Sequence, residues 1–186
     1  MIFPKVFQNI LDKNNIDKII TYINNNISDF GTLKANDYWS GRTLFYDSIK
    51  DTTVKNLILE NTKFGLSILS QHTDKQLYCE HLSIARWPEG YNLEPHADAE
   101  NPAGLAPHPY PWRNFAMITF LNQDFDGGIL YFPNQKLEII PQPGKSVIFP
   151  GSLQYLHGVT KILKGNRYTI ASFLTYDTTK SSISLI

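Results

Sequence analysis

Apolar side chains recur at helical intervals in the first third of the chain. Across residues 4–26 they stand mostly three or four positions apart among Asn, Asp and Lys, which predicts one or two amphipathic helices. The pattern returns across residues 53–70, where Gly65 is expected to interrupt it. We expect these helices to brace a sheet, because the apolar face of a surface helix usually serves packing.

From residue 77 the pattern changes to short apolar or alternating runs bounded by Gly, Pro and Asn, which is typical of β-strands. The predicted strands are 77–87, 92–98, 113–121, 128–132, 136–140, 146–149, 154–159 and 167–176. About eight strands in roughly 100 residues fit two packed antiparallel sheets. The sequence therefore predicts a mainly β (α+β) fold, a double-stranded β-helix or jelly roll over residues 77–176, with bracing helices in residues 1–76.

Length and charge favour one enzyme-sized domain spanning residues 1–186. The 17 basic and 17 acidic side chains cancel, so no net field attracts nucleic acid or an anionic membrane. The single cysteine, Cys79, cannot form an internal disulfide and suggests a reducing compartment. The first residues lack the pattern of a signal peptide and no stretch approaches membrane-spanning length, so we expect a cytoplasmic protein without a membrane partner.

His96 and Asp98 stand one residue apart on a predicted strand. Alternate residues of a strand share a face, so both side chains can bind one ion. His157 lies in a second strand-like run. Two imidazoles and one carboxylate form the ligand set that holds Fe(II) on one side and leaves about three positions open for O2 and a chelating co-substrate. The sequence therefore predicts an iron site.

Arg167 opens the most convincing strand of the chain, and a Gly-Asn turn signal at residues 165–166 precedes it. A hairpin centred near residue 162 or 163 would set His157 almost opposite Arg167. The guanidinium would then lie a few ångströms behind the metal. We expect it to hold the far carboxylate of a ligand with two acid groups, since guanidinium binds carboxylate through two parallel hydrogen bonds.

Structural explanations compete with the iron site. A His-x-Asp pair by itself is weak evidence for a metal site. We interpret the other histidines, His72, His81 and His108, as structural. A cupin-like isomerase or a metal-binding module without oxygen chemistry is the alternative from a different class of protein. Such a protein would not need Arg167 at its position, so the ordered set favours an oxygen-using enzyme.

The connection over residues 99–112 is long and rich in proline and follows Asp98 directly. Structureless loops of this length tend to be lids or binding loops, and we expect this one to be mobile without substrate and to close over the metal. The candidate substrate-binding residues are the aromatic and basic side chains of this loop and of the turn before the ligands: Arg86, Trp87, Tyr91, Tyr110 and Trp112.

Residues 77–176 resemble the 2-oxoglutarate and Fe(II)-dependent oxygenases, and within them most closely the prolyl 4-hydroxylase group. The resemblance rests on the Trp-Pro-Glu-Gly turn at residues 87–90 that leads to His-Ala-Asp at residues 96–98, and on three further segments. These segments are Asp-Gly-Gly-Ile-Leu-Tyr-Phe-Pro at 126–133, Pro-Gly-Lys-Ser-Val-Ile-Phe-Pro at 143–150, and His-Gly-Val at 157–159 followed by Gly-Asn-Arg-Tyr-Thr at 165–169.

The resemblance implies that His96, Asp98 and His157 are the iron ligands. It also implies that Arg167 binds the distal carboxylate of 2-oxoglutarate with help from the hydroxyl group of Thr169.

Two positions depart from the oxygen-sensing relatives, which carry tyrosines where this chain has Trp87 and Phe120. We therefore expect Tyr78 or Tyr131 to supply the missing hydroxyl to the co-substrate.

The implied activity is hydroxylation of an unactivated C–H bond, with decarboxylation of 2-oxoglutarate to succinate. The implied cofactors are Fe(II), 2-oxoglutarate as co-substrate and O2, with ascorbate as an accompanying reductant. The favoured substrate is a prolyl residue of a peptide or protein, and a free amino acid or other small metabolite is the alternative. Nucleic-acid demethylation is disfavoured, because those relatives carry a second Arg where this chain has Phe173.

Overall fold

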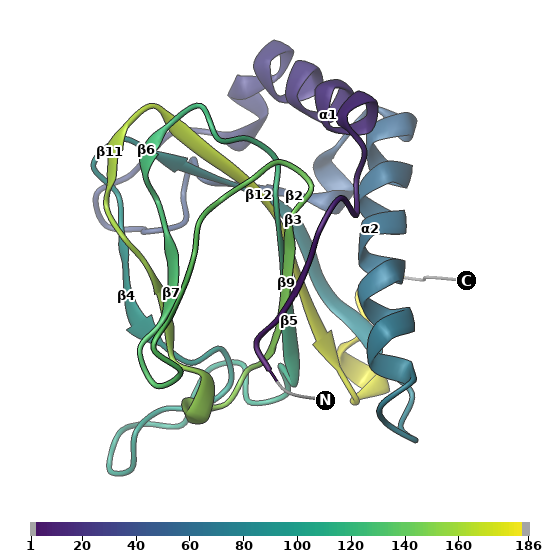
Figure 1. Ribbon diagram of the computed structural model, residues 1–186, viewed down its shortest axis with the longest axis vertical. Helices are drawn as coiled ribbons and strands as arrows, with labels where there is room; N and C mark the ends of the chain where they lie inside the picture. Colours follow the sequence, from purple (N-terminus) through teal and green to yellow (C-terminus); the bar gives the residue numbers. More distant parts are fainter. Residues whose placement is uncertain (1–2, 184–186) are drawn as a thin grey trace.

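The computed structural model describes residues 3–183, in which two antiparallel sheets face each other and two helices cover the outer side of one of them (Figure 1). The helices are α1 (Lys13–Asn25) and α2 (Thr52–Ser70). Each begins at an aspartate whose carboxylate accepts a hydrogen bond from the third residue along: Asp12 from the amide of Asn15 at 2.8 Å and Asp51 from that of Val54 at 2.9 Å.

The larger sheet has six strands, in the spatial order β1 (Lys5–Phe7), β9 (Ser146–Pro150), β5 (Phe115–Phe120), β12 (Asn166–Thr175), β3 (Tyr78–Pro88) and β2 (Thr43–Phe45). The facing sheet has four, β4 (Leu93–His96), β10 (His157–Val159), β7 (Leu130–Phe132) and β8 (Leu137–Ile139), and β11 (Ile162–Lys164) pairs with β6 (Asp126–Gly127). Short 3-10 turns are Ile27–Phe30, Tyr46–Ser48, Leu153–Tyr155 and Thr178–Lys180. The jelly-roll prediction is confirmed.

The alternation of side chains along β3 separates two apolar cores. Leu82 and Ile84 pack with the helices on the outer side of the large sheet, whereas Ala85 and Trp87 pack between the two sheets. Buried hydrogen bonds also fasten α2 to the large sheet, from Thr119 to Asn61 at 3.0 Å and between Thr62 and Ser172 at 2.9 Å. The helices are therefore joined to the sheet that forms one wall of the cavity described below.

Two local predictions for the first third are wrong. Residues 5–7, expected in a helix, form strand β1 against β9, because their side chains fit the edge of the large sheet. Gly65 does not interrupt α2, which runs through it. A Cβ atom at Gly65 would lie 2.4 Å from the sulfur of Met117, so the glycine lets the helix approach β5 closely.

The predicted hairpin between His157 and Arg167 is also wrong. His157 pairs with His96 in the small sheet, whereas Arg167 pairs with Trp87 in the large one. The intervening strand β11 pairs with β6, and Gly165, at φ +82°, turns the chain into β12. The predicted turn is therefore present, but it connects β11, which pairs with β6, to β12 of the large sheet.

Within residues 3–183 we find no helix that is both long enough and apolar enough to cross a membrane.

Candidate metal and co-substrate site

Three predicted ligands meet at one end of the small sheet. His96 ends β4, Asp98 lies two residues further along, and His157 opens β10 as the register partner of His96. Their ligand atoms all lie within 4.8 Å of one another. The Asp98 carboxylate stands between the two rings, 3.6 Å from Nε2 of His96 and 3.7 Å from Nε2 of His157. This spacing suits one metal ion bound on a single face.

Backbone carbonyls fix the orientation of both imidazoles. Nδ1 of His96 lies 3.0 Å from the carbonyl oxygen of Glu94, and Nδ1 of His157 lies 3.1 Å from that of Tyr155. A carbonyl oxygen only accepts hydrogen bonds, so each Nδ1 carries the proton and donates it. Each Nε2 therefore keeps a free lone pair directed at the shared site, as metal ligation requires.

The protonation states of His157 and Asp98 also suit a metal. Burial lowers the pKa of His157 and keeps the ring neutral. Burial by itself would raise the pKa of Asp98, but the two nearby imidazoles more than offset this, so the pKa of Asp98 stays below its usual value. Oδ2 of Asp98 is buried and has no hydrogen-bond partner among residues 3–183. A cation bound there would satisfy that oxygen, so the donor set fits Fe(II).

The metal ligands open into a cavity of about 620 Å³ between the two sheets. Arg167 and Thr169 lie in its wall together with Trp87, and we call this part the Arg167 end. Glu80 and Arg113 lie in the wall of a second part, which we call the Arg113 end. Apolar side chains complete the walls: Ala85, Leu93, Ile118, Leu130, Val159 and Ala171.

At the Arg167 end the guanidinium is almost fully buried, with 1% of the residue exposed. Its central carbon lies 5.3 Å from the ring centroid of Trp87 and 5.1 Å from that of Phe120. Burial, followed by the positive charge of Arg42, lowers the pKa of Arg167 to about 9, so the group remains protonated at neutral pH. No carboxylate lies within ion-pair distance of it in the part of the chain that the structure describes.

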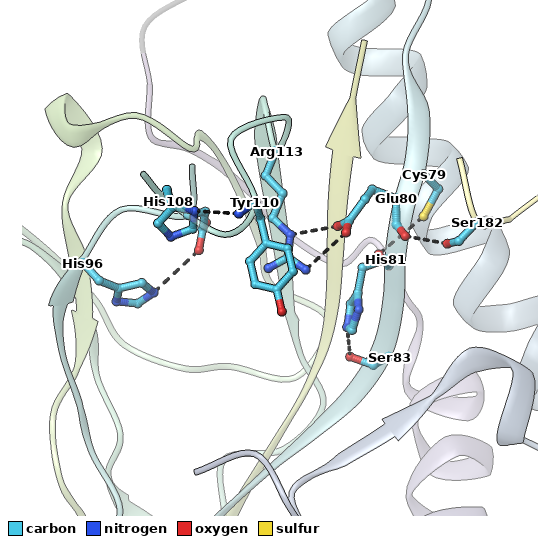
Figure 2. A network of polar contacts seen from close by, with 10 residues as sticks. Cys79, Glu80, His81, Ser83, His96, His108, Tyr110, Arg113 and Ser182 are labelled. Atoms are coloured by element: carbon cyan, nitrogen blue, oxygen red, sulfur yellow. Dashed lines mark hydrogen bonds and ion pairs between the residues drawn. The ribbon is translucent and has the colours of Figure 1, made fainter. Parts of the chain in front are cut away.

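At the Arg113 end the cation is already paired (Figure 2). Nε and Nη2 of Arg113 donate to the two carboxylate oxygens of Glu80 at 2.8 and 3.4 Å. The guanidinium lies between the rings of Tyr110 and Phe173, 3.9 and 4.0 Å from their centroids. Beside it, His81 forms a 2.8 Å hydrogen bond with Ser83.

The structure divides the predicted substrate residues into two groups. Trp87 and Tyr110 line the cavity. The others do not: Arg86 donates from Nε to Asn166 at 3.1 Å, the Tyr91 ring lies 4.4 Å from the guanidinium of Arg42, and the Trp112 ring lies 4.1 Å from Nζ of Lys180. The mobility of the loop over residues 99–112 stays a prediction.

Tyr78 and Tyr131, expected to supply a hydroxyl to the co-substrate, do not line the cavity. Tyr78 opens β3 nine residues before Trp87, a distance of about 30 Å along an extended strand. The Tyr131 ring lies over Gly158, whose neighbours in β10 face the cavity, so it covers the outer side of the small sheet. Arg167, Thr169 and the three metal ligands do line the cavity, as predicted.

Several residues of the cavity wall were not predicted as part of the site. They are Trp39, Thr43, Phe45, Glu80, His81, His108 and Arg113. The first three come from the helical third, which we expected only to brace the sheet. Thr43 and Phe45 reach the cavity on strand β2, which pairs with β3, and Trp39 lies in the turn before it. A strand of three residues is too short to give a periodic signal.

Comparison with known sequences gives a family match over residues 82–175, to the 2OG-Fe(II) oxygenase superfamily. Prolyl 3-hydroxylase 1 of Gallus gallus is 38% identical over 76 residues, which cover 38% of this chain and 10% of that protein. Prolyl 3-hydroxylase 2 of Mus musculus is 28% identical over 90 residues, covering 46% and 12%. The match therefore spans about a tenth of the length of these relatives.

Solved structures share the fold across nearly the whole chain. The viral collagen prolyl hydroxylase of Paramecium Bursaria Chlorella virus-1, in its 2OG complex, gives a TM-score of 0.67 at 16% identity, covering 94% of this chain and 96% of that chain. A Pseudomonas putida prolyl-4-hydroxylase gives 0.62 at 13% identity, covering 92% and 83%. A Trichoplax adhaerens prolyl hydroxylase, in complex with a hypoxia inducible factor peptide fragment, gives 0.66 at 17% identity, covering 97% and 86%.

Proposed function

Because this chain belongs to the 2OG-Fe(II) oxygenase superfamily, we propose that it hydroxylates a prolyl residue of a peptide or protein, with Fe(II), 2-oxoglutarate and O2. The observation that carries the proposal is a single cavity that contains both the His96–Asp98–His157 ligand set and the unpaired cation of Arg167. One group of residues fits the metal, and the other fits the second acid group of 2-oxoglutarate.

The residues of this chain bind the metal, orient the co-substrate and exclude water. The two imidazoles and Asp98 hold the iron, which when bound supplies the oxidation chemistry that couples loss of CO2 from 2-oxoglutarate to hydroxylation. Arg167 would bind the distal carboxylate and so fix the orientation of 2-oxoglutarate in the cavity. The apolar wall keeps water from the reacting groups, because side chains such as Ile118 and Val159 offer no hydrogen bonds.

The relatives and the Arg113 end support a prolyl substrate. The similar proteins of known sequence are prolyl 3-hydroxylases, and a similar solved structure is that of a prolyl-4-hydroxylase. Tyr110, His81 and Phe173 offer flat rings beside the metal ligands, against which a proline ring can pack. A peptide is favoured over nucleic acid, because positive and negative charges cancel across the chain.

The experiment measures succinate release from 2-oxoglutarate by the Fe(II)-loaded protein with proline-containing peptides, collagen-like sequences included. Mass spectrometry of the peptide detects the added oxygen, and chromatography after hydrolysis separates 3- from 4-hydroxyproline. We expect peptide-stimulated succinate release and hydroxyproline, both absent from the His157→Ala variant. Succinate release stimulated only by free amino acids would contradict the peptide substrate.

The alternatives from a different class of protein, a cupin-like isomerase or a metal-binding module, do not use an unpaired buried Arg167 beside the metal ligands and are not favoured. We also propose a cytoplasmic location, which the buried free thiol of Cys79 supports. Fractionation of the source cells tests that location.

A further inference from the structure

Three buried nitrogen atoms near the Arg167 end lack a hydrogen-bond partner among residues 3–183. They are Nη2 of Arg42, Nε1 of Trp87 and Nε of Arg167. The three residues are 0%, 5% and 1% exposed. Buried polar groups in folded proteins are almost always hydrogen-bonded, because an unsatisfied one loses its water without compensation. Trp87 and Arg167 both line the cavity, so two of these donors belong to residues in its wall that lack an acceptor.

The same place holds two positive charges without a negative one. Arg42 and Arg167 are close enough that the charge of Arg42 adds to burial in lowering the pKa of Arg167. No carboxylate pairs with either guanidinium in the described part of the chain. Buried like charges repel each other strongly, so an anion that enters here gains from both.

Trp87 connects the two cations. Its Cα is the register partner of Arg167, so both side chains leave the large sheet on the same face. Its ring centroid lies 4.5 Å from the guanidinium carbon of Arg42 and 5.3 Å from that of Arg167. Trp87 and Arg167 line the cavity, whereas Arg42 lies behind them.

Arg42 is held rigidly in that position. Its guanidinium lies 4.0 Å from the ring centroid of Tyr38, 4.9 Å from that of Trp39 and 4.4 Å from that of Tyr91, besides the contact with Trp87. It donates to the carbonyl oxygens of Tyr38 at 3.1 Å and Arg86 at 3.4 Å. These contacts fix the cation against the indole.

We propose that the indole N–H of Trp87 donates a hydrogen bond to the distal carboxylate that Arg167 binds, and that Arg42 is the positioning residue that holds this indole and adds a second positive charge behind it. The inference rests on the proposed function and extends it. It assigns to an indole the hydrogen bond that neither Phe120, which has no donor, nor Tyr131, which lies outside the cavity, can supply.

The test compares two keto acids in the Zn(II)-loaded protein, where no turnover occurs. Calorimetry measures the dissociation constants of 2-oxoglutarate and of pyruvate, which has the same chelating group but no distal carboxylate. Trp87→Phe keeps a flat ring and removes the donor, so we expect 2-oxoglutarate to bind about tenfold more weakly and pyruvate to bind unchanged. Arg42→Met should give the same selective loss, and Arg42→Lys should recover part of it.

Trp112→Phe is the matched control, because Nε1 of Trp112 also lacks a partner but Trp112 does not line the cavity. It should leave both affinities unchanged. Equal weakening of 2-oxoglutarate and pyruvate binding by Trp87→Phe would assign Trp87 and Arg42 a purely structural role and overturn the inference alone. A parent protein that does not bind 2-oxoglutarate would overturn the proposed function and the inference with it.

A second measurement needs no variant and so does not depend on folding of a mutant. The chain has 3 tryptophans, and each gives one indole N–H signal in the NMR spectrum of the Zn(II)-loaded protein. We expect 2-oxoglutarate, but not pyruvate, to shift the signal of Trp87 downfield, as a new hydrogen bond to a carboxylate does. An unmoved Trp87 signal at saturating 2-oxoglutarate would contradict the inference.

Discussion

Each end of the cavity carries an arginine, and the two arginines have opposite roles. Arg113 and Arg167 both project into it, and both stack against aromatic rings. Arg113, however, is paired with Glu80 through two hydrogen bonds, whereas Arg167 has no carboxylate partner within residues 3–183. The charge of Arg113 is neutralised inside the protein, and the charge of Arg167 is left for a ligand.

The difference shows that burial and aromatic stacking alone do not identify a ligand-binding arginine. A paired arginine shapes a wall, because separating it from its carboxylate leaves both charges unsatisfied. An unpaired buried arginine keeps a desolvation cost that a bound anion removes. The predictions that follow test this contrast, from the largest expected effect to the smallest.

Removal of a metal ligand should abolish function at both ends. We expect His157→Ala to lose tight Fe(II) binding and all detectable succinate release, because two ligands remain where three are needed. The fold should persist, since the core beneath the helices does not include this side chain, and the core between the sheets meets its ring only through Phe132 and Phe149. Calorimetry of metal binding and circular dichroism check both statements. Turnover at the parent rate would show that the ligand set is wrong.

Loss of the unpaired arginine should weaken co-substrate binding selectively. Arg167→Ala removes the partner of the distal carboxylate, worth on the order of 2–4 kcal/mol, so the dissociation constant of 2-oxoglutarate should rise roughly thirtyfold to a thousandfold. Arg113→Ala should change it by less than about threefold, because Arg113 is already neutralised by Glu80. Equal effects of the two variants would remove the distinction between the two ends.

Stability should change in opposite directions at the two ends. Arg113→Met leaves Glu80, which is 12% exposed, without its partner, and should lower the free energy of unfolding by about 2–4 kcal/mol. Arg167→Met removes an unpaired buried charge and should leave the free energy of unfolding unchanged or raise it by about 1 kcal/mol. Urea unfolding of the ligand-free proteins measures both. A large loss of unfolding free energy for Arg167→Met would indicate that Arg167 does have a carboxylate partner, and the difference between the two ends would disappear.

The Arg113 end should also make stability depend on pH through His81. Burial, and then the charge of Arg113, lowers the pKa of His81 from 6.5 to about 4. Between about pH 4 and pH 6.5, His81 is therefore protonated in the unfolded chain and neutral in the folded chain. The contribution of His81 to the free energy of unfolding is complete above about pH 6.5. It falls by roughly 1–3 kcal/mol as the pH drops to about 4. His81→Gln should flatten this part of the urea-unfolding profile, and an unchanged slope would contradict the assignment.

The smallest effect is expected from the loop over residues 99–112. Tyr110 lies over Arg113 at the cavity wall, whereas Trp112 lies outside the cavity. Tyr110→Ala should slow peptide hydroxylation about threefold to tenfold and spare the slow decay of 2-oxoglutarate without peptide. Trp112→Ala should have less effect on both. If Tyr110→Ala reduces both reactions equally, the loop supports Asp98 and does not act as a gate.

The metal site was predictable because its signal is local. His96 and Asp98 stand two positions apart at the end of β4, and Arg167 and Thr169 share a face of β12 by simple alternation. The Arg113–Glu80 pair was not predictable, because it joins residues 33 positions apart, one on β3 and the other just before β5. Arg42 was hidden for a related reason: it precedes a three-residue strand in a region whose periodicity indicated only helices.

The wrong hairpin has the same origin. The Gly-Asn signal at residues 165–166 reports a turn, and a turn was found, but the signal does not specify which strands pair across it. Strand pairing depends on long-range packing between the sheets. A single sequence therefore showed which residues could bind the metal better than it showed how they are brought together.

The family match, which spans residues 82–175, cannot be excised as a working minimal fragment. A protein cut at its start would lack Asn61 and Thr62, leaving Thr119 without that acceptor and Ser172 without its buried partner, and it would lack Arg42 behind Trp87. The outer apolar face of the large sheet would meet water and favour aggregation. Chimeras that exchange oxygenase barrels between proteins must therefore carry the segment from Tyr38 to the end of α2 with the barrel it closes.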